Sequence, residues 1–445
     1  MSEQESDSFS QRLKRYAKVS TKLTYLVTQL AGHYVGTSLD RPAHALALKT
    51  ALGDLKGPIM KIAQLLSTIP DALPEEYAKE LAHLQSQAPS MGWPFVNRRM
   101  KAELGPDWQT KFAFFEHTAA AAASLGQVHK AQDLQNHTLA CKLQYPNMSA
   151  VVEADLKQLK ILLKLYETYD KAVRTSYIYP EIAARIREEL DYNLEAKHIQ
   201  LYQTMLQDEP TIHVPNVIPE LSTKRLLSMT WLAGEPLMQA KQRSLDARNQ
   251  IARNMFRAWY VPFYNYGIIH GDPHLGNYTI PENNSVNLLD FGCIRVFPST
   301  LVQGVIDLYF ALQNNDQERA IHAYESWGFD NISKELIEVL NGWAKFLYGP
   351  ILEDRIRPID ENQSGIYGRE VAGKVHAALR EIGGVSPPAE FVFMDRAAIG
   401  LGSVFLHLKA EINWYQEFHG LIRGFDKDAM ARKQQKILRQ VELSA

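Results

Sequence analysis

Two short motifs a little past the middle of the chain constrain it more than any other part of its sequence. HGDPHLGN occupies positions 270–277, and DFG follows at 290–292. Asp272 precedes Asn277 by five residues and Asp290 by eighteen, which leaves room for a hairpin formed by NYTI and VNLL. Phosphoryl transfer requires a carboxylate beside the accepting hydroxyl or water, and an amide oxygen and a second carboxylate to hold Mg²⁺ against the phosphates. The two motifs together therefore predict a phosphoryl-transfer site.

The spacing also suggests a role for each residue. Asp-x-x-x-x-Asn is the spacing of the kinase catalytic loop, so Asp272 is expected to act as the base or to orient water. Asn277 and Asp290 are the expected metal ligands. Lys142 lies in the apolar segment LACKLQY, a predicted strand that would bury its stem and direct its ammonium to the α- and β-phosphates.

A lysine in this position needs a carboxylate partner from a helix. The segment EELDYNLEA at 188–196 offers Glu189, Asp191 and Glu195. Asp191 and Glu195 are four residues apart and share one face of the predicted helix, whereas Glu189 points elsewhere. A solvated acidic face is the alternative interpretation.

An alanine-rich segment lies where a kinase would have its glycine-rich phosphate loop. It reads AAAAASLGQVHKA, and Gly126 is its only glycine. Backbone amides near Ala121, Ala122 and Ala123 can still bind phosphates, and Ser124 adds a hydroxyl. Each methyl group restricts φ and keeps the backbone away from a ligand. We therefore expect nucleotide binding that differs from that of a standard protein kinase.

The order of helical and strand-like segments predicts an α+β, bilobal protein-kinase-like fold with a helical N-terminal extension. The extension covers 1–110, a kinase-like N-lobe with inserted helices covers 111–232, and a helical kinase-like C-lobe covers 233–445. The connector at Met229–Ala233, including Trp231, is expected to read the adenine through its backbone. In the N-lobe we expect strands within KFAFFEH, VHKA and TLACKLQY, helices at 149–168 and 181–205, and strands at 211–214 and 225–231.

Composition excludes several other classes of protein. A formal net charge of -2 argues against a nucleic-acid binder, and two cysteines cannot form a disulfide framework, which favours a reducing compartment. The sequence shows neither a signal peptide nor a run of 18 apolar residues. We expect a cytoplasmic protein, with peripheral membrane contact as an option through a basic amphipathic helix at 9–30.

Taken in order, these segments resemble the UbiB/AarF family of atypical kinases over most of the chain. The markers are KIAQ at 61–64, AAAASLGQVHKA at 120–131, Lys142, EELDYNLEA, HGDPHLGN and DFG. By spacing alone, Lys61 and Gln64 are polar residues on one face of an amphipathic helix. The resemblance implies that this helix folds over the nucleotide, with Lys61 and Gln64 covering the phosphates. The glycine of the family's first motif is Ala63 here.

The resemblance implies further roles and an activity. Glu195 would pair with Lys142, while Glu189 and Asp191 would contact the covering helix or the metal. The expected cofactors are ATP or ADP with Mg²⁺, and the expected activity is that of an ATPase or an atypical kinase. Expected partners are the nucleotide, a membrane surface with quinone-precursor lipid, and other proteins of ubiquinone biosynthesis.

Three alternatives remain open. The HGD-x-H-x-x-N loop is also similar to those of aminoglycoside and choline kinases, which are small-molecule phosphotransferases. A conventional Ser/Thr protein kinase is disfavoured by the alanine-rich loop and by the lack of an APE-like sequence soon after Asp290. A catalytically silent nucleotide-binding scaffold would fit Ala63 and the alanine-rich loop, although every catalytic position is filled.

Overall fold

The computed structural model describes residues 91–123, 125–169, 178–272, 274–329, 332–361, 378 and 389–443. Lys61, Gln64 and Ser124, and the basic helix expected at 9–30, lie outside the described residues. The described chain divides into two compact units. The first comprises residues up to Asn193 together with Ile218–Thr230, and the second comprises Leu194–Val217 and Trp231 onward.

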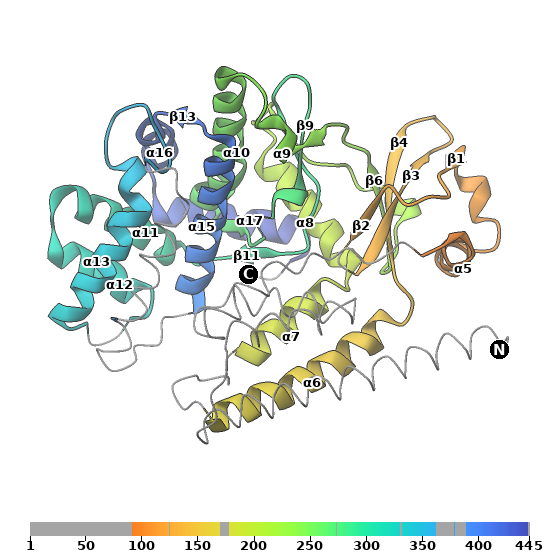
Figure 1. Ribbon diagram of the computed structural model, residues 1–445, viewed down its shortest axis with the longest axis horizontal. Helices are drawn as coiled ribbons and strands as arrows, with labels where there is room; N and C mark the ends of the chain where they lie inside the picture. The colour runs from red at the N-terminus through yellow and green to blue at the C-terminus, as the bar shows by residue number, and fades with distance from the viewer. Residues whose placement is uncertain are drawn as a thin grey trace, which may run out of the picture. The chain divides into compact units, whose positions relative to one another are not determined.

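The first unit is built on an antiparallel sheet with the order β1-β3-β4-β6, in which β2 pairs with β3 (Figure 1). Its strands are β1 (Phe114–Phe115), β2 (Ala121–Ala123), β3 (Gly126–Gln132), β4 (Thr138–Gln144) and β6 (Leu226–Thr230). Its helices are α5 (Trp93–Leu104), η1 (Trp108–Lys111), α6 (Met148–Tyr169), α7 (Ile178–Glu188) and η2 (Pro219–Leu221). The predicted strands in VHKA, TLACKLQY and 225–231 are thus confirmed.

Helix α5 covers one face of this sheet. Its buried residues Val96 and Met100 pack with Trp108 and with Leu139 and Cys141 of β4. Trp93, Phe95 and Leu104 of α5 are partly buried against the same cluster, whereas Lys101 is exposed. A second apolar cluster joins α6 to α7.

Two features of the first unit differ from the prediction. The alanine run forms a strand, β2, which pairs with β3 so that Ala123 lies opposite Gly126. The helix expected at 181–205 is interrupted: α7 ends at Glu188 and α8 (Tyr192–Met205) begins after a turn. Asp191 therefore precedes α8, and the prediction that it shares a helical face with Glu195 is wrong.

The second unit is mainly helical. Its helices are α8, α9 (Leu237–Ala240), α10 (Leu245–Tyr266), η3 (Leu275–Asn277), α11 (Ser299–Asn314), α12 (Gln317–Ser326), α13 (Lys334–Tyr348), η4 (Gly349–Ile351), α15 (Ala389–Leu408), α16 (Trp414–Ile422) and α17 (Lys427–Gln440). Its short strands are β5 (Ile212–His213), β7 (Glu235–Pro236), β8 (Ile268–His270), β9 (Tyr278–Ile280), β10 (Val286–Leu288), β11 (Ile294–Val296), β12 (Arg357–Pro358) and β13 (Glu411–Ile412). The hairpin expected between the two motifs is present as β9 and β10.

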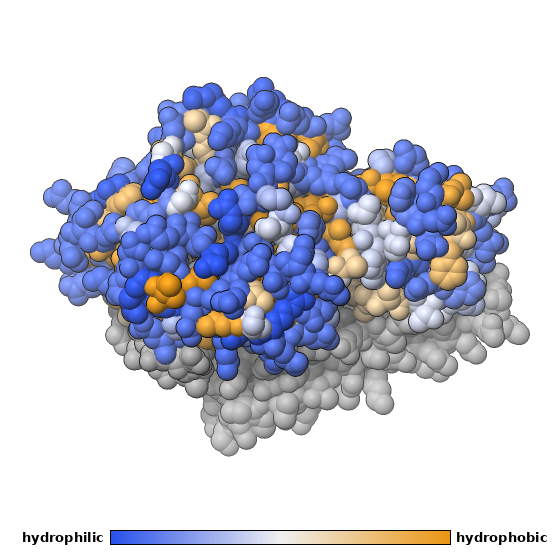
Figure 2. Space-filling view, turned by 90° about the horizontal axis from the view of Figure 1, so that it is seen from above, coloured by the Kyte–Doolittle hydropathy of each residue, from blue (hydrophilic) through white to orange (hydrophobic). Residues whose placement is uncertain are grey.

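The surface of the described residues is mainly hydrophilic on the face shown in Figure 2, and apolar residues form separate patches there. In the described part of the chain, none of the helices combines the length and the apolar character that crossing a membrane requires.

Candidate functional site

A helix end and a short strand position the HGD motif in the second unit. Helix α10 stops at Gly267, whose φ of 65° lies in the left-handed region and whose N–H donates to the carbonyl of Phe263 at 2.8 Å. A Cβ at this position would lie 2.6 Å from the Phe297 carbonyl oxygen, so only glycine fits. The chain then enters β8, which pairs with β11 so that His270 lies opposite Ile294. This pairing sets the HGD loop beside the segment that follows DFG.

His270 connects the two motifs through its ring. Its Nε2 lies 2.7 Å from the carbonyl oxygen of Asp290, and its Nδ1 accepts the backbone N–H of Asp272 at 3.1 Å. A carbonyl can only accept, so Nε2 carries the proton and Nδ1 is bare. The buried, neutral imidazole therefore fixes the backbone of both aspartates.

Asn277 is held by the same loop. Its side-chain Nδ2 donates to the backbone carbonyl of Asp272 at 3.3 Å. Its backbone carbonyl accepts the N–H of Leu289 at 3.0 Å. Because the amide nitrogen is used internally, the side-chain oxygen is the atom that can face a cation. Asp290 accepts the N–H of Gly292 at 3.0 Å, which orients its carboxylate.

The two carboxylates also share a neighbour. Tyr278 is fully buried at the start of β9, and its hydroxyl accepts the indole N–H of Trp259 at 3.1 Å. Burial raises the pKa of Tyr278 well above its usual value, and the negative charges of Asp272 and Asp290 raise it further. Both acidic groups therefore act electrostatically on one buried phenol, which places their charges in one region of the second unit.

Helix α8 supports the DFG segment from its first turn. The carboxylate of Glu195 accepts the N–H of Phe291 at 3.5 Å, and Nδ1 of His198 donates to the Phe291 carbonyl at 2.9 Å. Glu195 and His198 are three residues apart, so they lie on one face of α8. Burial lowers the pKa of His198 to about 4, which keeps its ring neutral.

The donor set suits a cation that a nucleotide helps to hold. Among the described residues, no cluster of three or more histidine, cysteine or acidic side chains is arranged to bind a metal. Mg²⁺ is usually held by one or two carboxylates plus phosphate oxygens and waters. One amide oxygen and one carboxylate, from Asn277 and Asp290, fit that pattern.

Lys142 lies in the centre of β4 in the first unit. It is paired with Val128 of β3 on one side and with Leu227 of β6 on the other. Its side chain is buried, and its ammonium lies 5.3 Å from the centre of the Tyr192 ring. Because β4 is paired on both edges, it holds Lys142 rigidly, and Lys142 does not lie on an edge strand.

The alanine-rich segment forms a tight hairpin in this unit. Gly126 begins β3, and a Cβ there would lie only 2.2 Å from the Leu143 carbonyl oxygen. The glycine is therefore required by the close approach of β3 to β4. The side chains of Ala121 and Ala122 are exposed on β2.

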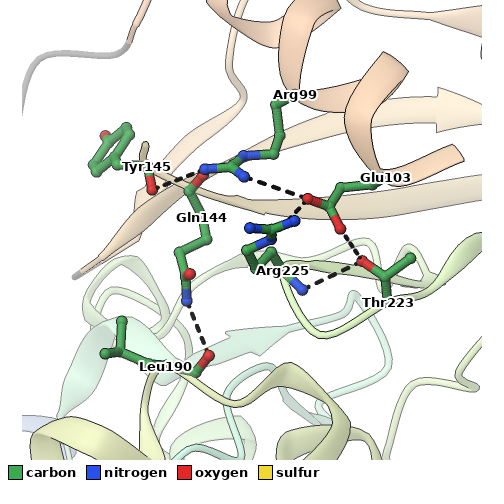
Figure 3. A network of polar contacts seen from close by, with 7 residues as sticks. All are labelled: Arg99, Glu103, Gln144, Tyr145, Leu190, Thr223 and Arg225. Atoms are coloured by element: carbon green, nitrogen blue, oxygen red, sulfur yellow. Dashed lines mark hydrogen bonds and ion pairs between the residues drawn. The ribbon is translucent and has the colours of Figure 1, made fainter. Parts of the chain in front are cut away.

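A network of charges joins α5 to the end of β4 (Figure 3). Arg99 donates to the carbonyls of Gln144 and Tyr145 at 3.2 and 3.1 Å, and to Glu103 at 3.3 Å. The Glu103 carboxylate also pairs with Arg225 at 2.9 Å and accepts the hydroxyl of Thr223 at 2.7 Å. Helix α5 is thus attached both to the end of the strand that carries Lys142 and to Thr223 and Arg225, which precede β6.

The remaining predicted residues fall in different places. Met229 lies in β6, paired with Ala140, and Trp231 begins the next segment of the second unit. Asp191 accepts the N–H of Asn193 at 3.1 Å and forms an ion pair with Lys224 at 3.6 Å, so it stabilises the start of α8. Glu189 lies in the turn between α7 and α8. The second unit holds Asp272, Asn277, Asp290 and Glu195, and the first holds Lys142 and the alanine hairpin; the pairing of Lys142 with Glu195 stays a prediction.

The sequence interpretation gave no role to three residues that organise this region. His198 has a signal, since it follows Glu195 by three positions on the same helix. His270 belongs to the HGD motif, where its position suggests contact with the loop. Tyr278 follows Asn277 directly, but nothing in the sequence shows that its hydroxyl lies near both carboxylates.

Comparison with protein families identifies one matching model. Residues 83–324, more than half of the chain, match the ABC1 atypical kinase-like domain. The yeast (Saccharomyces cerevisiae) protein "Atypical kinase COQ8, mitochondrial" is 31% identical over 250 residues, which cover 56% of this chain and 50% of that protein. "Atypical kinase COQ8B, mitochondrial" from Rattus norvegicus is 27% identical over 366 residues, covering 76% of this chain and 69% of that protein. The chain thus spans about half the length of the yeast relative and just over two thirds of the rat one.

A solved structure shows the same fold. It is the complex of Rv3197 with erythromycin from Mycobacterium tuberculosis, with a TM-score of 0.61 and 23% sequence identity. The similarity covers 91% of this chain and 99% of that chain. The kinase-like fold predicted from the motif order is therefore confirmed.

Proposed function

The chain belongs to the family of ABC1 atypical kinase-like domains, and on that basis we propose that it binds Mg-ATP or Mg-ADP and hydrolyses ATP. The observation that carries the proposal is the arrangement of Asp272 and Asp290 in the second unit. His270 fixes the backbone of both residues, and the charges of both raise the pKa of the buried Tyr278. Carboxylates held in this way are suited to phosphate chemistry, in which positioning supplies most of the catalysis.

We assign the proposed roles to polar side-chain atoms that can contact a ligand. Asp272 accepts a proton from the attacking water or hydroxyl, or orients that water. Asn277, through its side-chain oxygen, and Asp290 hold Mg²⁺, which when bound neutralises charge on the phosphates. Lys142 binds the α- and β-phosphates, and Glu195 orients Lys142.

We propose less direct roles for the other predicted residues. The backbone of the alanine hairpin at 121–126, including Ser124, contacts the phosphates. The segment from Met229 to Trp231 reads the adenine. Lys61 and Gln64 cover the nucleotide, and Glu189 and Asp191 stabilise that cover or the metal.

The wider proposal is that ATP turnover supports ubiquinone biosynthesis or the handling of quinone-precursor lipids at a membrane surface. Support for it comes from the family resemblance and from the likeness to proteins named COQ8 and COQ8B. No individual residue carries it.

The first experiment measures phosphate release from Mg-ATP by the purified protein, with and without anionic liposomes. The Asp290→Asn variant removes one charge from the metal site at nearly constant shape. Asp428→Asn, at an exposed position in the first turn of α17, is the matched control. Release that is present in the unchanged protein and the control, and is lost in Asp290→Asn, supports the ATPase; stimulation by liposomes supports the membrane role.

The opposite result separates the alternatives. If release does not exceed that of Asp290→Asn under either condition, the ATPase proposal fails. Mg-dependent ADP binding without release would then indicate a silent scaffold or a phosphotransferase that lacks its acceptor.

A further inference from the structure

A large cavity lies within the second unit, and none of the described residues proposed to bind nucleotide lines it. Its volume is about 840 Å³, within the range of roughly 300–1,000 Å³ typical of small-molecule sites. Helices α10, α11, α13, α15 and α16 contribute its walls, and these helices lie together in Figure 1. Lys142, Asp272, Asn277 and Asp290 are not among the lining residues.

The walls carry many aromatic side chains. Phe256 and Tyr260 come from α10, Trp343 from α13, Phe405 from α15 and Trp414 from α16. Flat, rigid rings offer much apolar contact area and lose little entropy on binding, so they favour an apolar ligand. Among the described lining residues, the charged ones are Lys345, Arg357, Asp360 and Glu361, two of each sign. Because these charges balance, the cavity favours a neutral ligand over an ionic one.

Two phenolic hydroxyls in this cavity have no hydrogen-bond partner within the part of the chain that the structure describes. Tyr348 donates to the carbonyl of Val305 at 3.1 Å, so the fold satisfies that phenol internally. The hydroxyls of Tyr260 and Tyr264, by contrast, form no hydrogen bond with any of the described residues. Tyr264 is only 5% exposed as a residue, but its hydroxyl is not one of the fully enclosed, unpaired polar atoms, so a ligand or water in the cavity can reach it.

The two phenols act as a pair. Tyr260 and Tyr264 are one helical turn apart on α10, and their rings stack with centres 5.9 Å apart. Burial raises the pKa of Tyr260 to about 12 and that of Tyr264 well above the usual value, so both hydroxyls keep their protons at neutral pH. Each can therefore donate a hydrogen bond to an oxygen acceptor in the cavity.

We propose that this cavity, called here the aromatic cavity, binds a neutral, largely apolar molecule that carries at least one hydrogen-bond-accepting oxygen. Aromatic rings from α10, α13, α15 and α16 enclose the apolar part of the ligand, and Tyr260 and Tyr264 donate to its oxygen. The site is separate from the proposed nucleotide site and does not depend on it.

One glycine allows the cavity to be filled without disturbing its walls. Gly402 lies on α15 and lines the cavity, and a Cβ built on it meets no atom within 4 Å. Leucine at 402 would occupy the cavity and would also favour the helix. Gly342 on α13 is the matched control, because its Cβ also meets no atom within 4 Å and it does not line the cavity.

The test uses Nile red, a neutral aromatic dye with a carbonyl oxygen, whose fluorescence reports an apolar surrounding. Titration of the full chain should show saturable binding. Gly402→Leu should weaken binding by about tenfold or more because the leucine side chain occupies space that the dye needs. Gly342→Leu should leave it unchanged, and Tyr264→Phe should weaken it about fivefold by removing one hydrogen bond. The melting temperature and ADP binding of each variant show that it is folded and that the nucleotide site is intact.

Two results would overturn the proposal. Equal affinity of Nile red for Gly402→Leu and Gly342→Leu means that the dye binds elsewhere and that the cavity is not a ligand site. Equal affinity for Tyr264→Phe and the unchanged protein means that the phenols do not recognise an oxygen. Failure of ATP hydrolysis would leave both readouts unaffected, so the two proposals are tested independently.

Discussion

His270 shows how one side chain can organise a site without touching a ligand. Its ring accepts a hydrogen bond from the backbone N–H of Asp272 and donates one to the backbone carbonyl of Asp290. These two bonds hold the HGD and DFG motifs at a fixed separation. Only one neutral tautomer satisfies both bonds. A protonated ring would have no acceptor for the Asp272 N–H, so this geometry belongs to the neutral form.

His198 makes stability depend on pH. Burial lowers its pKa from 6.5 to about 4, so the unfolded chain takes up this proton at a higher pH than the native protein does. The free energy of unfolding therefore has its full value above pH 6.5. It decreases as the pH falls toward 4, by about 3 kcal/mol in total. We expect urea unfolding between pH 7.5 and 4.5 to show this loss, and His198→Gln to reduce it.

The control for this prediction is His322→Gln, because His322 is exposed on α12. In that variant the free energy of unfolding should change with pH as steeply as it does in the unchanged protein. If the free energy of unfolding depended on pH in the same way in His198→Gln and in the unchanged protein, His198 would not be the source of the pH dependence.

Gly126 leads to a second prediction at this scale. A methyl group at 126 would lie 2.2 Å from the Leu143 carbonyl oxygen, so β3 and β4 must separate beside Lys142. We expect Gly126→Ala to lower the free energy of unfolding by roughly 2–4 kcal/mol. Gly342→Ala, at an open position, should be neutral or slightly stabilising in the same urea titration. A Gly126→Ala protein as stable as the control would show that the strands are not this close.

At the scale of elements, α5 is fastened to the sheet by charge as well as by apolar packing. Glu103 is 5% exposed in its side chain and lies between Arg99 and Arg225. Arg99 in turn holds the carbonyls at the end of β4. Loss of the carboxylate would leave Arg99, 10% exposed in its side chain, without its charged partner.

We therefore expect Glu103→Ala to destabilise the first unit by roughly 2–4 kcal/mol, because a half-removed buried ion pair costs more than an exposed one. Thermal unfolding monitored by tryptophan fluorescence measures the change. Glu153→Ala is the control, since both side chains of its ion pair with Arg187 are about half exposed, and it should cost well under about 1 kcal/mol. If both variants lost the same amount of stability, the burial of Glu103 would not increase the contribution of its ion pairs to stability.

The elements that could be predicted from the sequence are those with a strong local pattern. Thr138–Gln144 and Leu226–Thr230 are apolar runs and form β4 and β6, and the hairpin between HGD and DFG follows from motif spacing. β2 could not be predicted in this way, because alanine has low strand propensity and the run does not alternate. It becomes a strand through its pairing with β3.

The break between α7 and α8 has a similar cause. EELDYNLEA contains no glycine or proline, so helical spacing continues through it without a stop signal. In the structure the Tyr192 N–H donates to the carbonyl of Lys224 at 3.2 Å, and Asp191 accepts from Asn193. A contact with a residue far along the chain thus ends the helix. The same limit applies to the site: sequence shows the carboxylates, but the hydrogen bonds of His270 and His198 depend on tertiary pairing.

At the scale of the whole molecule, the two units are interleaved along the chain. The chain leaves the first unit after Asn193, returns at Ile218 for the hairpin that contains β6, and leaves again at Trp231. β6 pairs with β4 over five positions, from Leu139↔Thr230 to Leu143↔Leu226. The first unit therefore cannot be completed until the chain has passed through a segment of the second.

We expect from this that a chain ending at Asn193 does not fold cooperatively. Without β6, the strand that carries Lys142 has an unpaired edge, and buried Leu139, Cys141 and Leu143 lose part of their cover. A chain ending at Leu443 provides the control. Circular dichroism during heating should show one or more sharp transitions for the control and a gradual change for the short chain. Amide exchange gives a direct check, since the N–H groups of β4 should be protected only when β6 is present; protection in the short chain would show that the first unit folds without β6.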